Sequence, residues 1–263
     1  MAKLDKVIVV KMGGSVFDSC DTTIEDIVHL QQQGRQMVIV HGGGNLVSEW
    51  LARQGIPTRF VHGERVTDKP ALDMVTAVLA GLANKEIVAA INCAGGQAIG
   101  ICGVDGALIQ SRISDRELGY VGVVVKVNTA PLEALLEAGY IPVIAPLSLH
   151  SFDRTDDAPQ ILNINGDPLA GEIAAAVSAE QLIFLTDVAG ICDQSGKLLP
   201  QLSSSEAEAL IASGIASGGM IPKIRACLTA LSSTSSARII DGRQPHALLN
   251  ELDRQGDGTT IYK

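Results

Sequence analysis

Two glycine-rich turns near the start of the chain have the composition of a phosphate-binding site. Each follows an apolar run: residues 7–10 lead into Lys11-Met12-Gly13-Gly14-Ser15, and residues 37–40 lead into His41-Gly42-Gly43-Gly44-Asn45. Because glycine lacks Cβ, such turns can direct backbone N–H groups at an anion and let phosphate oxygens approach closely. A lysine at a strand end is by itself commonly a solvated terminus, but the two glycines after Lys11 favour a role in phosphate chemistry.

The two turns share one crevice if the apolar runs are neighbouring parallel strands. A helix over 22–33 would then make the crossover between them. The carboxyl ends of both strands would lie on the same edge of the sheet, which is where open α/β sheets bind their ligands.

A lone arginine, Arg65, precedes a long helical pattern over 69–93. Thr67 or Asp68 is a good N-cap for that helix, with Pro70 tolerated in its first turn. The guanidinium of Arg65 is a rigid fork that suits bidentate binding of a carboxylate. A surface salt bridge is the alternative explanation for this arginine.

A third polar group stands in the run Asn163-Ile164-Asn165-Gly166-Asp167-Pro168. Asp167 before Pro168 is typical of an N-cap followed by proline in the first helical position, here of a helix over 168–178. Strand-like alternation would project Asn163, Asn165 and Asp167 to one side. The pattern therefore places two amides and a carboxylate beside a helix amino-terminus.

The second half of the chain carries two further candidate anion-binding segments. A buried strand over 182–186 enters a turn that continues to Cys192, and Ile215-Ala216-Ser217-Gly218-Gly219 leads into a helix over 219–232 that carries Lys223. A helix amino-terminus behind glycines favours anions through its free N–H groups and its dipole. The chain has neither a Walker A box nor the GxGxxG fingerprint, so a nucleotide would need a different phosphate cradle.

Alternation of apolar runs with amphipathic stretches predicts an α/β fold with helices packed on a mainly parallel sheet. The expected strands cover 7–10, 37–40, 97–102, 141–145, 182–186 and 237–240, and the expected helices cover 22–33, 45–54, 69–93, 129–138, 168–178, 204–213, 219–232 and 244–252. Apolar residues make up 46% of the chain and aromatic residues 3%, which favours a core of Val, Ile, Leu and Ala.

The polar stretches 103–106, 112–119 and 151–160 predict short hairpins and loops that cover a pocket. The last of these is the best candidate for a seam between two lobes, residues 1–150 and residues 151–263. It lacks the length and the Gly/Ser bias of a flexible linker, so we expect one continuous sheet.

Charge and targeting signals favour a cytoplasmic enzyme that acts on a small molecule. The net charge of −9 offers no footprint for nucleic acid or for an anionic membrane. The chain shows no signal-peptide pattern and no uninterrupted apolar stretch of about twenty residues. The five cysteines (Cys20, Cys93, Cys102, Cys192 and Cys227) are scattered without a CxxC pair, so buried, unreactive thiols are expected.

Taken in order, these motifs resemble those of the amino acid kinase superfamily and, within it, the acetylglutamate kinases. The resemblance extends over the whole chain. It is carried by Lys11-Met-Gly-Gly, His41-Gly-Gly-Gly, Gly63-Glu-Arg-Val-Thr-Asp68, Ala80-Gly-Leu-Ala-Asn-Lys85, Gly103-Val-Asp-Gly106, Asn163-Ile-Asn-Gly-Asp167, Leu185-Thr-Asp-Val-Ala-Gly-Ile191, Gly219-Met-Ile-Pro-Lys223 and Gly258-Thr-Thr-Ile261. The segment Arg65-Val-Thr-Asp68 narrows the match to the acetylglutamate branch.

The resemblance implies a three-layer αβα fold and transfer of the γ-phosphoryl group of ATP, with Mg²⁺ carried by the nucleotide, to the side-chain carboxylate of N-acetyl-L-glutamate. Lys11 and Lys223 would neutralise the phosphoryl group, and Asp167 would hold both lysines. The implied contacts are Gly13 and Gly14 with the phosphates, Gly43 and Gly44 with acceptor and phosphoryl, and Arg65 and Asn163 with the acceptor. The adenosine part would meet Thr186, Asp187, Val188, Gly190, Ile191, Cys192, Ile215, Ala216 and Ser217.

Two residues depart from the family pattern: Glu64 stands where an apolar residue is expected, and Asn45 where proline is common. Glu64 could pair with Arg65 and weaken acceptor binding. Few residues precede the first strand, so we expect a homodimer without the extra amino-terminal helix and the arginine inhibition of hexameric relatives.

Two other functions remain open at this level. One is a kinase for aminoadipate or glutamate, free or linked to an acidic carrier protein, which the net charge disfavours. The other is a non-catalytic regulator that binds an amino acid or a nucleotide, which would not need Lys11, Lys223 and Asp167. Carbamate and uridylate kinases share the fold but have no need of Arg65-Val-Thr-Asp68.

Overall fold

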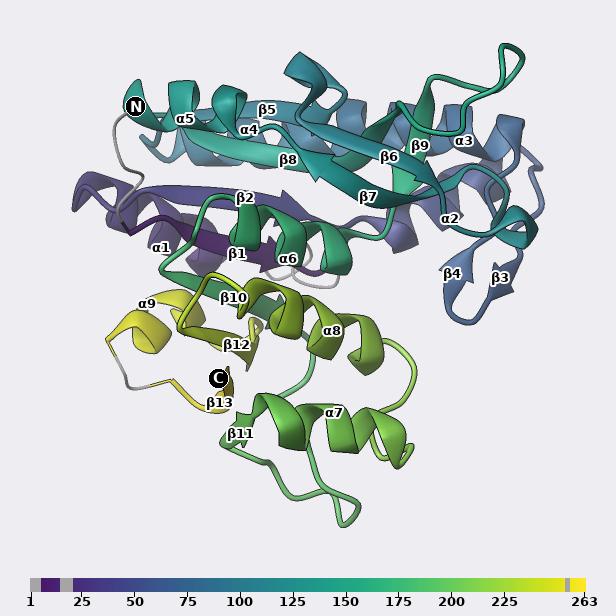
Figure 1. The fold of residues 1–263 in the computed structure, drawn as a ribbon. Coiled ribbons are helices and arrows are strands. Elements are labelled where there is room, and N and C mark those ends of the chain that lie inside the picture. Colours follow the sequence, from purple (N-terminus) through teal and green to yellow (C-terminus); the bar gives the residue numbers. More distant parts are fainter. Residues whose placement is uncertain (1–5, 15–20, 254–255) are drawn as a thin grey trace.

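The computed structural model describes residues 6–14, 21–253 and 256–263. Within these residues one eleven-stranded sheet has the order β11-β13-β12-β10-β1-β2-β8-β6-β7-β9, with β5 also paired to β8 (Figure 1). Its strands are β1 (Ile8–Met12), β2 (Met37–His41), β5 (Ala98–Gly103), β6 (Ile109–Ile113), β7 (Val121–Val127), β8 (Ile141–His150), β9 (Ile161–Ile164), β10 (Gln181–Thr186), β11 (Gln201–Ser203), β12 (Ser236–Asp241) and β13 (Gly258–Tyr262). A separate hairpin pairs β3 (Phe60–Val61) with β4 (Glu64–Arg65).

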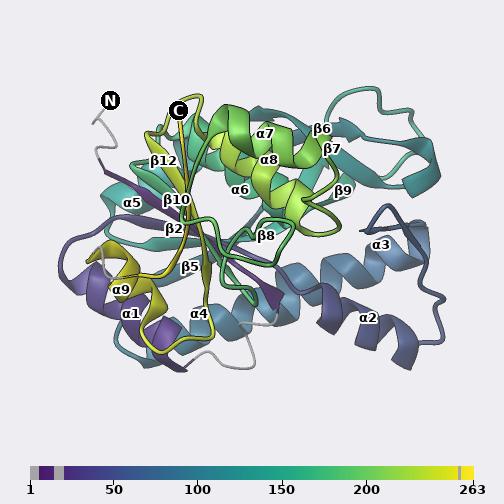
Figure 2. The same ribbon diagram turned by 90° about the horizontal axis from the view of Figure 1, so that it is seen from below.

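Helices cover both faces of the sheet, which confirms the predicted α/β class (Figure 2). They are α1 (Asp21–Gln32), α2 (Gly44–Arg53), α3 (Lys69–Thr76), α4 (Asn84–Cys93), α5 (Ala130–Glu137), α6 (Gly166–Ala176), α7 (Ser204–Ala212), α8 (Met220–Ala230) and α9 (Ala247–Leu252). A π-helix, η2 (Ala77–Ala83), joins α3 to α4, and the 3₁₀ turns η3 (Asp105–Ala107) and η4 (Arg116–Leu118) flank β6. Apolar residues of α1, α4 and α9 pack on one face, and those of α5 to α8 on the other.

In the central strand β1, the alternation of side chains between the two faces of the sheet positions a residue of the site. In β1, Ile8, Val10 and Met12 belong to the core under α1 and α4, whereas Val9 belongs to the core under α6 and α8. Because side chains alternate along a strand, Lys11 points to the same face as Val9. Lys11 is therefore directed at the layer that contains α6 and α8.

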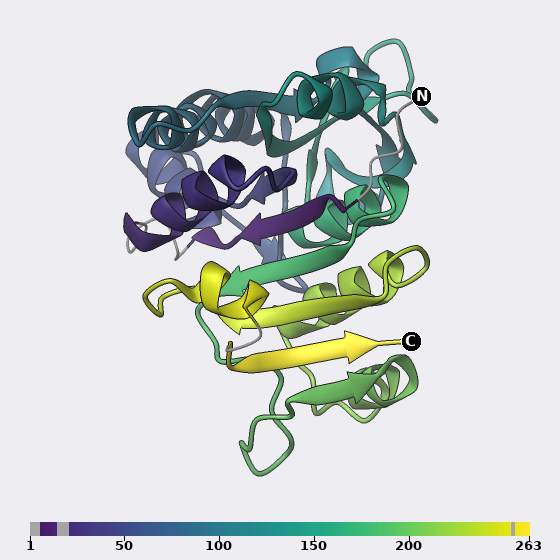
Figure 3. The same ribbon diagram turned by 90° about the vertical axis from the view of Figure 1, so that its left-hand side faces the viewer.

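Parallel pairing brings the two glycine turns to one edge of the sheet. Met12 is level with His41 of β2 and with Leu185 of β10. Figure 3 shows β1 (purple) and β10 (green) pointing in the same direction, whereas β13 (yellow) runs the opposite way. The turns after β1, β2 and β10 therefore leave the sheet side by side.

Every strand and helix predicted from the sequence has a counterpart among the described residues, but several strands were missed. The β6–β7 hairpin, β9, β11 and β13 are short or irregular, and their pairing depends on distant partners such as β8 and β12. The prediction of buried thiols is wrong for Cys93 and Cys192, which are exposed. Ser15 and Cys20 lie outside the described residues.

The helix from Lys69 to Cys93 is long and apolar enough to cross a membrane by length and composition alone, with mean hydropathy 1.6. Asn84, Lys85 and Glu86 interrupt its apolar sequence. In the fold, η2 packs against β8, and α4 packs against β5 and β8. These contacts are those of a helix in a core layer.

Candidate functional site

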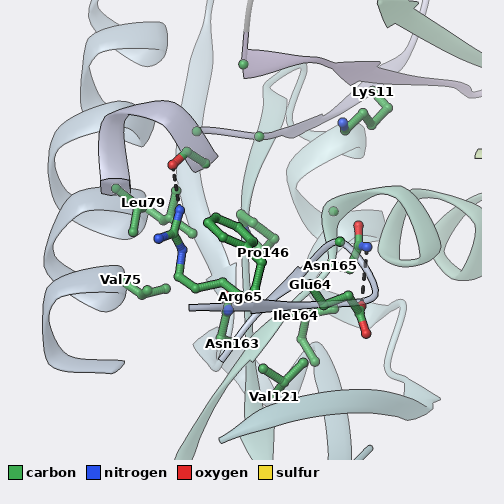
Figure 4. A pocket seen from close by; sticks show the side chains of 18 residues that line it. Lys11, Glu64, Arg65, Val75, Leu79, Val121, Pro146, Asn163, Ile164 and Asn165 are labelled. Carbon is green, nitrogen blue, oxygen red and sulfur yellow. Dashed lines mark hydrogen bonds between the residues drawn. The ribbon is translucent and has the colours of Figure 1, made fainter. Parts of the chain in front are cut away.

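A cavity of about 250 Å³ opens where the glycine turns meet the β3–β4 hairpin and the start of α6. Figure 4 shows Arg65 and Lys11 approaching this cavity from different sides. The lining residues are Lys11, Gly14, Gly42, Gly43, Gly44, Val47, Phe60, Gly63, Glu64, Arg65, Val75, Leu79, Val121, Pro146, Asn163, Ile164, Asn165 and Gly166. Six of the residues expected at the acceptor and phosphoryl positions line this cavity: Lys11, Gly14, Gly43, Gly44, Arg65 and Asn163.

Lys11 and Lys223 meet on the two oxygens of a single carboxylate. The Nζ of Lys11 is 2.6 Å from Oδ1 of Asp167, and the Nζ of Lys223 is 2.9 Å from Oδ2. Lys223 also donates a hydrogen bond to the carbonyl of Gly219 at 3.3 Å. The structure thus joins residues from β1, α6 and α8 in one charge cluster at the carboxyl edge of the sheet.

The start of α6 explains why Asp167 is available to the lysines. Asp167 was expected to be the N-cap, but Asn165 holds that position and its side chain accepts from the N–H of Asp167 at 3.0 Å. The prediction that Asp167 caps the helix is therefore wrong, because Asn165 satisfies the free backbone donor instead. Asp167 lies in the first turn, where the helix dipole also favours a negative charge.

Burial and the lysines act in opposite directions on Asp167. Burial raises the pKa of this carboxyl, but the attraction of Lys11 and Lys223 outweighs it, so the net pKa lies below the ordinary value. Asp167 is therefore ionised at neutral pH. The cluster carries two positive charges and one negative charge, which leaves one net positive charge for an anionic ligand.

Arg65 is buried and keeps its positive charge without an acidic partner among the described residues. Its Nη2 donates to the carbonyl of Gly44 at 2.8 Å and to Oγ of Ser48 at 2.7 Å, and its guanidinium lies 4.8 Å from the ring centre of Phe60. Burial lowers the pKa of Arg65, but an arginine remains charged at any physiological pH. The surface salt bridge considered from the sequence is not found.

Glu64 does not pair with Arg65 in the described structure. Its carboxylate accepts a hydrogen bond from Nδ2 of Asn165 at 3.4 Å, and the Arg65 guanidinium points away from this pair (Figure 4). Asn163 lines the cavity and donates to the hydroxyl of Thr67 at 3.2 Å. Of the two N-cap candidates for α3, Asp68 takes that position, whereas the hydroxyl of Thr67 accepts the hydrogen bond from Asn163.

The glycine turns touch each other, and a side chain would make close contacts at two positions. A Cβ on Gly42 would lie 3.2 Å from the N of Gly14, and one on Gly43 would lie 2.8 Å from Cδ2 of Leu79. Gly43 also has a φ of 139°, which L side chains rarely adopt. Gly13 donates to the carbonyl of Leu185 at 3.0 Å, which ties the first turn to β10.

The residues expected around the adenosine follow β10 and precede α8. Thr186 ends β10, and its hydroxyl accepts from the N–H of Val188 at 3.2 Å. The N–H of Ile191 donates to Oγ1 of Thr259 at 2.8 Å, which fixes the far end of this turn. Val188 and Ile215 expose 39% and 36% of their surface. Asp187, Gly190 and Cys192 lie in the same turn, and Ala216 and Ser217 follow Ile215 before α8.

Comparisons with known proteins show the family of this chain. The model of the amino acid kinase family matches residues 6–241, which span the glycine turns, the residues that line the cavity, and both lysines. The chain belongs to the amino acid kinase family.

Within this family the chain is similar to proteins named acetylglutamate kinase. It is 53% identical over 255 residues to that of Dehalococcoides mccartyi strain CBDB1, covering 97% of this chain and 94% of the relative. The Nostoc sp. strain PCC 7120 protein is 47% identical over 265 residues, covering 97% and 87%. A structure of N-acetylglutamate synthase from Neisseria gonorrhoeae, complexed with coenzyme A and N-acetyl-glutamate, matches with a TM-score of 0.84 and 28% identity over 98% of this chain and 59% of that one.

Sequence reasoning missed two uncharged residues that help to position the charged groups of this site. A Cβ on Gly171 of α6 would lie 2.5 Å from the carbonyl of Ala226 in α8, so the glycine permits the close helix contact that brings Asp167 to Lys223. Phe60, an exposed aromatic residue, stacks on the Arg65 guanidinium. A glycine inside a helical pattern was the available signal for Gly171, whereas nothing in the sequence pairs Phe60 with Arg65.

Proposed function

We propose that this amino acid kinase transfers the γ-phosphoryl group of ATP to the side-chain carboxylate of N-acetyl-L-glutamate. The product is N-acetyl-L-glutamyl 5-phosphate, an intermediate of arginine biosynthesis. The observation that carries the proposal is the pair of cationic groups on one cavity, Arg65 at one side and the cluster of Lys11, Asp167 and Lys223 at the other. The high identity to acetylglutamate kinases over nearly the whole chain supports the same substrate.

The placement of the two cationic groups suits an acceptor with two carboxylates. Arg65 would bind the α-carboxylate, because its fork is fixed by Gly44 and Ser48 before the substrate arrives. The side-chain carboxylate would then extend toward Lys11. Asn163 would bind the remaining polar groups of the acceptor from β9.

The chemistry requires charge neutralisation and does not require a general base. A glutamyl carboxylate has an ordinary pKa of about 4.3, so it is already ionised at neutral pH. Bringing it to a polyphosphate costs about 4 kcal/mol for each pair of like charges at 4 Å and an effective dielectric of about 20. Lys11, Lys223 and the N–H groups of Gly43 and Gly44 would oppose that repulsion and stabilise the loose transition state.

The nucleotide would enter from the other side of the lysines. Gly13 and Gly14 would face its phosphates. The walls of the adenosine part would be the two segments described above, Thr186 to Cys192 and Ile215 to Ser217, with the exposed Val188 and Ile215 offering apolar contact. These assignments rest on the resemblance to the acetylglutamate kinases and, for Thr186 to Cys192, on the position of that segment after β10 at the carboxyl edge of the sheet.

We propose that Mg²⁺ arrives with the ATP phosphates. Asp167 is engaged by both lysines and is therefore not free to bind a metal. Mg²⁺ commonly keeps several waters and is bound through substrate phosphates in kinases. When bound there, it would neutralise charge on the β- and γ-phosphates.

We also propose a cytoplasmic homodimer with two functional lobes. Residues 1–150 would form the acceptor and dimerisation lobe, and residues 151–263 would form the nucleotide lobe. Ala77, Ala89 and Ala90 of the helix from Lys69 to Cys93 are exposed, so charged substitutions at these positions would test whether this helix lies in the dimer contact. Inhibition by arginine is not expected of this dimer, and sub-millimolar inhibition would contradict that expectation.

The decisive experiment measures acceptor-dependent release of ADP from ATP with N-acetylglutamate, N-acetylaminoadipate, glutamate, carbamate and UMP, and traps the acyl phosphates formed on carboxylate acceptors with hydroxylamine. N-acetylglutamate should give the highest kcat/KM. Preference for an aminoadipate derivative would indicate the lysine-pathway kinase instead. No acceptor-dependent release of ADP with any of the five compounds would favour a non-catalytic regulator.

Lysine variants test the phosphoryl site. Lys11→Ala and Lys223→Ala should each lower kcat by about 10²–10⁴-fold, somewhat less than the contribution of an arginine finger. Lys126→Ala, on the exposed side of β7, is the matched control and should leave kcat unchanged. Near-native turnover in both site variants would contradict the assigned roles.

Arg65→Ala tests the acceptor site, and here the informative quantity is KM and not kcat. The contact with the α-carboxylate would persist from ground state to transition state, so the KM for N-acetylglutamate should rise while kcat changes little. Ser48→Ala removes one neighbour of Arg65 at 2.7 Å and keeps the charge, so it controls for local packing. A loss confined to kcat would be incompatible with this role.

A further inference from the structure

A buried polar network lies beneath the glycine turn of residues 42–44, and the proposed function leaves it unused. His41 is the last residue of β2, and Asn84 is the first residue of α4. Both are completely buried. Lys85 joins the network from the next position of the helix.

The hydrogen bonds define which nitrogen of His41 carries the proton. Nδ1 lies 2.7 Å from the carbonyl oxygen of Gly42, and an oxygen of this kind only accepts, so Nδ1 is the donor. Nε2 lies 3.2 Å from Nδ2 of Asn84, an amide nitrogen that only donates, so Nε2 is the acceptor. His41 is therefore a neutral imidazole with its hydrogen on Nδ1.

The orientation of Asn84 is itself fixed. Its Nδ2 also donates to the carbonyl of Val143 at 2.9 Å, and its Oδ1 accepts from Nζ of Lys85 at 2.9 Å. Lys85 donates in addition to the carbonyl of Gly100 at 3.0 Å. A flipped amide would place the Asn84 oxygen against the oxygen of Val143 and its nitrogen against an ammonium group.

The environment keeps the imidazole uncharged. Burial lowers the pKa of His41 to about 4; the hydrogen bond to Gly42 raises it, and the charges of Lys11 and Lys85 lower it further. At physiological pH the ring therefore acts as a fixed donor and a fixed acceptor.

Helix geometry and one glycine make room for this network. The π-helix η2 ends at Ala83, directly before Asn84, and a π turn changes the direction in which the following side chains point. On β5, a Cβ at Gly100 would lie 1.9 Å from Oδ1 of Asn84 and 2.7 Å from Nζ of Lys85. Gly100 is therefore a strand position where a side chain would displace the network.

The same helix holds the turn at a second point. Leu79 of η2 lies against Gly43, where a Cβ would be 2.8 Å from Cδ2 of that leucine. The turn is thus supported at Gly43 by packing and at Gly42 by the His41 hydrogen bond. A peptide unit is planar and trans, so when the Gly42 carbonyl points at His41, the N–H of Gly43 points away from His41.

We propose that His41, oriented by Asn84, is a positioning residue: it fixes the peptide unit between Gly42 and Gly43 so that the Gly43 N–H faces the group being transferred. This rests on the proposed function, since it needs a phosphoryl group at that turn. His41 does not touch substrate and exchanges no proton in the reaction. Its role is to preorganise a backbone donor.

The first test measures the tautomer in the wild-type enzyme. With ¹⁵N-labelled histidine, the His41 signals, assigned by their loss in His41→Asn, should show a protonated Nδ1 and an unprotonated Nε2 from about pH 6 to about pH 9. A proton on Nε2 in the wild-type protein would overturn the proposal. The tautomer itself is read in the wild-type protein, and His41→Asn serves only to assign the signals.

The second test separates positioning from simple packing. His41→Leu should lower kcat by about 10–100-fold, with the KM values for ATP and acceptor within about twofold, because a misplaced donor acts in the transition state. His41→Asn presents an amide N–H near the position of Nδ1 and should restore most of that loss. His29→Leu, at an exposed histidine of α1, is the matched control.

Asn84→Asp supplies the third arm. An aspartate in this position cannot donate to Nε2. If the proton moves to Nε2, Nδ1 can no longer donate to Gly42 and kcat should fall; if the ring becomes doubly protonated, Nδ1 still donates and kcat should be largely retained. Unchanged kcat with the proton moved to Nε2, or equal kcat in His41→Leu and wild type, would refute the positioning role. Absence of acyl phosphate formation by the wild type would instead refute the proposed function, while the tautomer measurement would still report on the network.

Discussion

Replacing Asp167 with asparagine should destabilise the protein strongly, because it removes the carboxylate that two buried lysines share. The side chains of Lys11 and Lys223 are only 9% and 17% exposed, and that of Asp167 is 7% exposed. The substitution keeps the size of the side chain. It leaves two ammonium groups facing one neutral amide.

The magnitude follows from the two ion pairs. At about 3 Å and an effective dielectric of about 20, each pair contributes an attraction of about 5 kcal/mol before desolvation is subtracted. Removing one partner of a buried pair costs about 3–5 kcal/mol in measured cases. Because Lys223 retains some access to water, we expect a loss of about 3 kcal/mol in unfolding free energy, equivalent to a fall of about 6–12 °C in Tm.

Urea denaturation followed by far-UV circular dichroism at several pH values is the assay. The pKa of Asp167 lies below its ordinary value in the folded protein, so the carboxylate stabilises the fold above its unfolded pKa and loses that effect as pH falls through the folded pKa. The difference between wild type and Asp167→Asn should therefore be constant from about pH 5 to about pH 8 and shrink below about pH 4.

Asp73→Asn is the matched control, since it breaks the exposed pair between Lys69 and Asp73, whose side chains are 57% and 65% exposed. That loss should be below about 0.5 kcal/mol. If Asp167→Asn were as stable as Asp73→Asn at neutral pH, the reasoning about the shared carboxylate would be refuted.

Two further predictions concern the backbone at Gly43 and the pair formed by His246 and Asp26. Gly43→Ala should lower kcat by at least about tenfold and reduce Tm, because φ is 139° and the new Cβ would lie 2.8 Å from Leu79; steady-state kinetics and calorimetry decide, and native values in both would contradict the assigned turn. The hydrogen bond and charge of Asp26 raise the pKa of His246, so the pair stabilises the fold below the unfolded pKa of about 6.5 and the effect is lost as pH rises through the folded pKa. His246→Ala should therefore lower Tm at about pH 6 and hardly at all at about pH 9. A difference in Tm between variant and wild type that does not change with pH would contradict a stabilising ion pair between His246 and Asp26.

The amino-acid sequence determined the layers of this protein and the residue types at its site. Strands buried on both faces need β-branched runs such as Val7 to Val10, and the alternation along that run directs Lys11 toward one helix layer. The glycine turns followed from the same local logic, because parallel strands end at one edge. These features depend on residues close together in the chain.

Only the tertiary structure decided which polar groups meet. Asp167 fits the local pattern of an N-cap, yet Asn165 takes that position and Asp167 pairs with lysines from β1 and α8. Glu64 stands beside Arg65 in the sequence but contacts Asn165 instead. The network of His41 and Asn84 likewise joins residues 43 positions apart. Local propensity arises from neighbouring residues, whereas the pairing of buried charges and amides depends on helix packing that the whole chain fixes, so sequence spacing alone could not assign these partners.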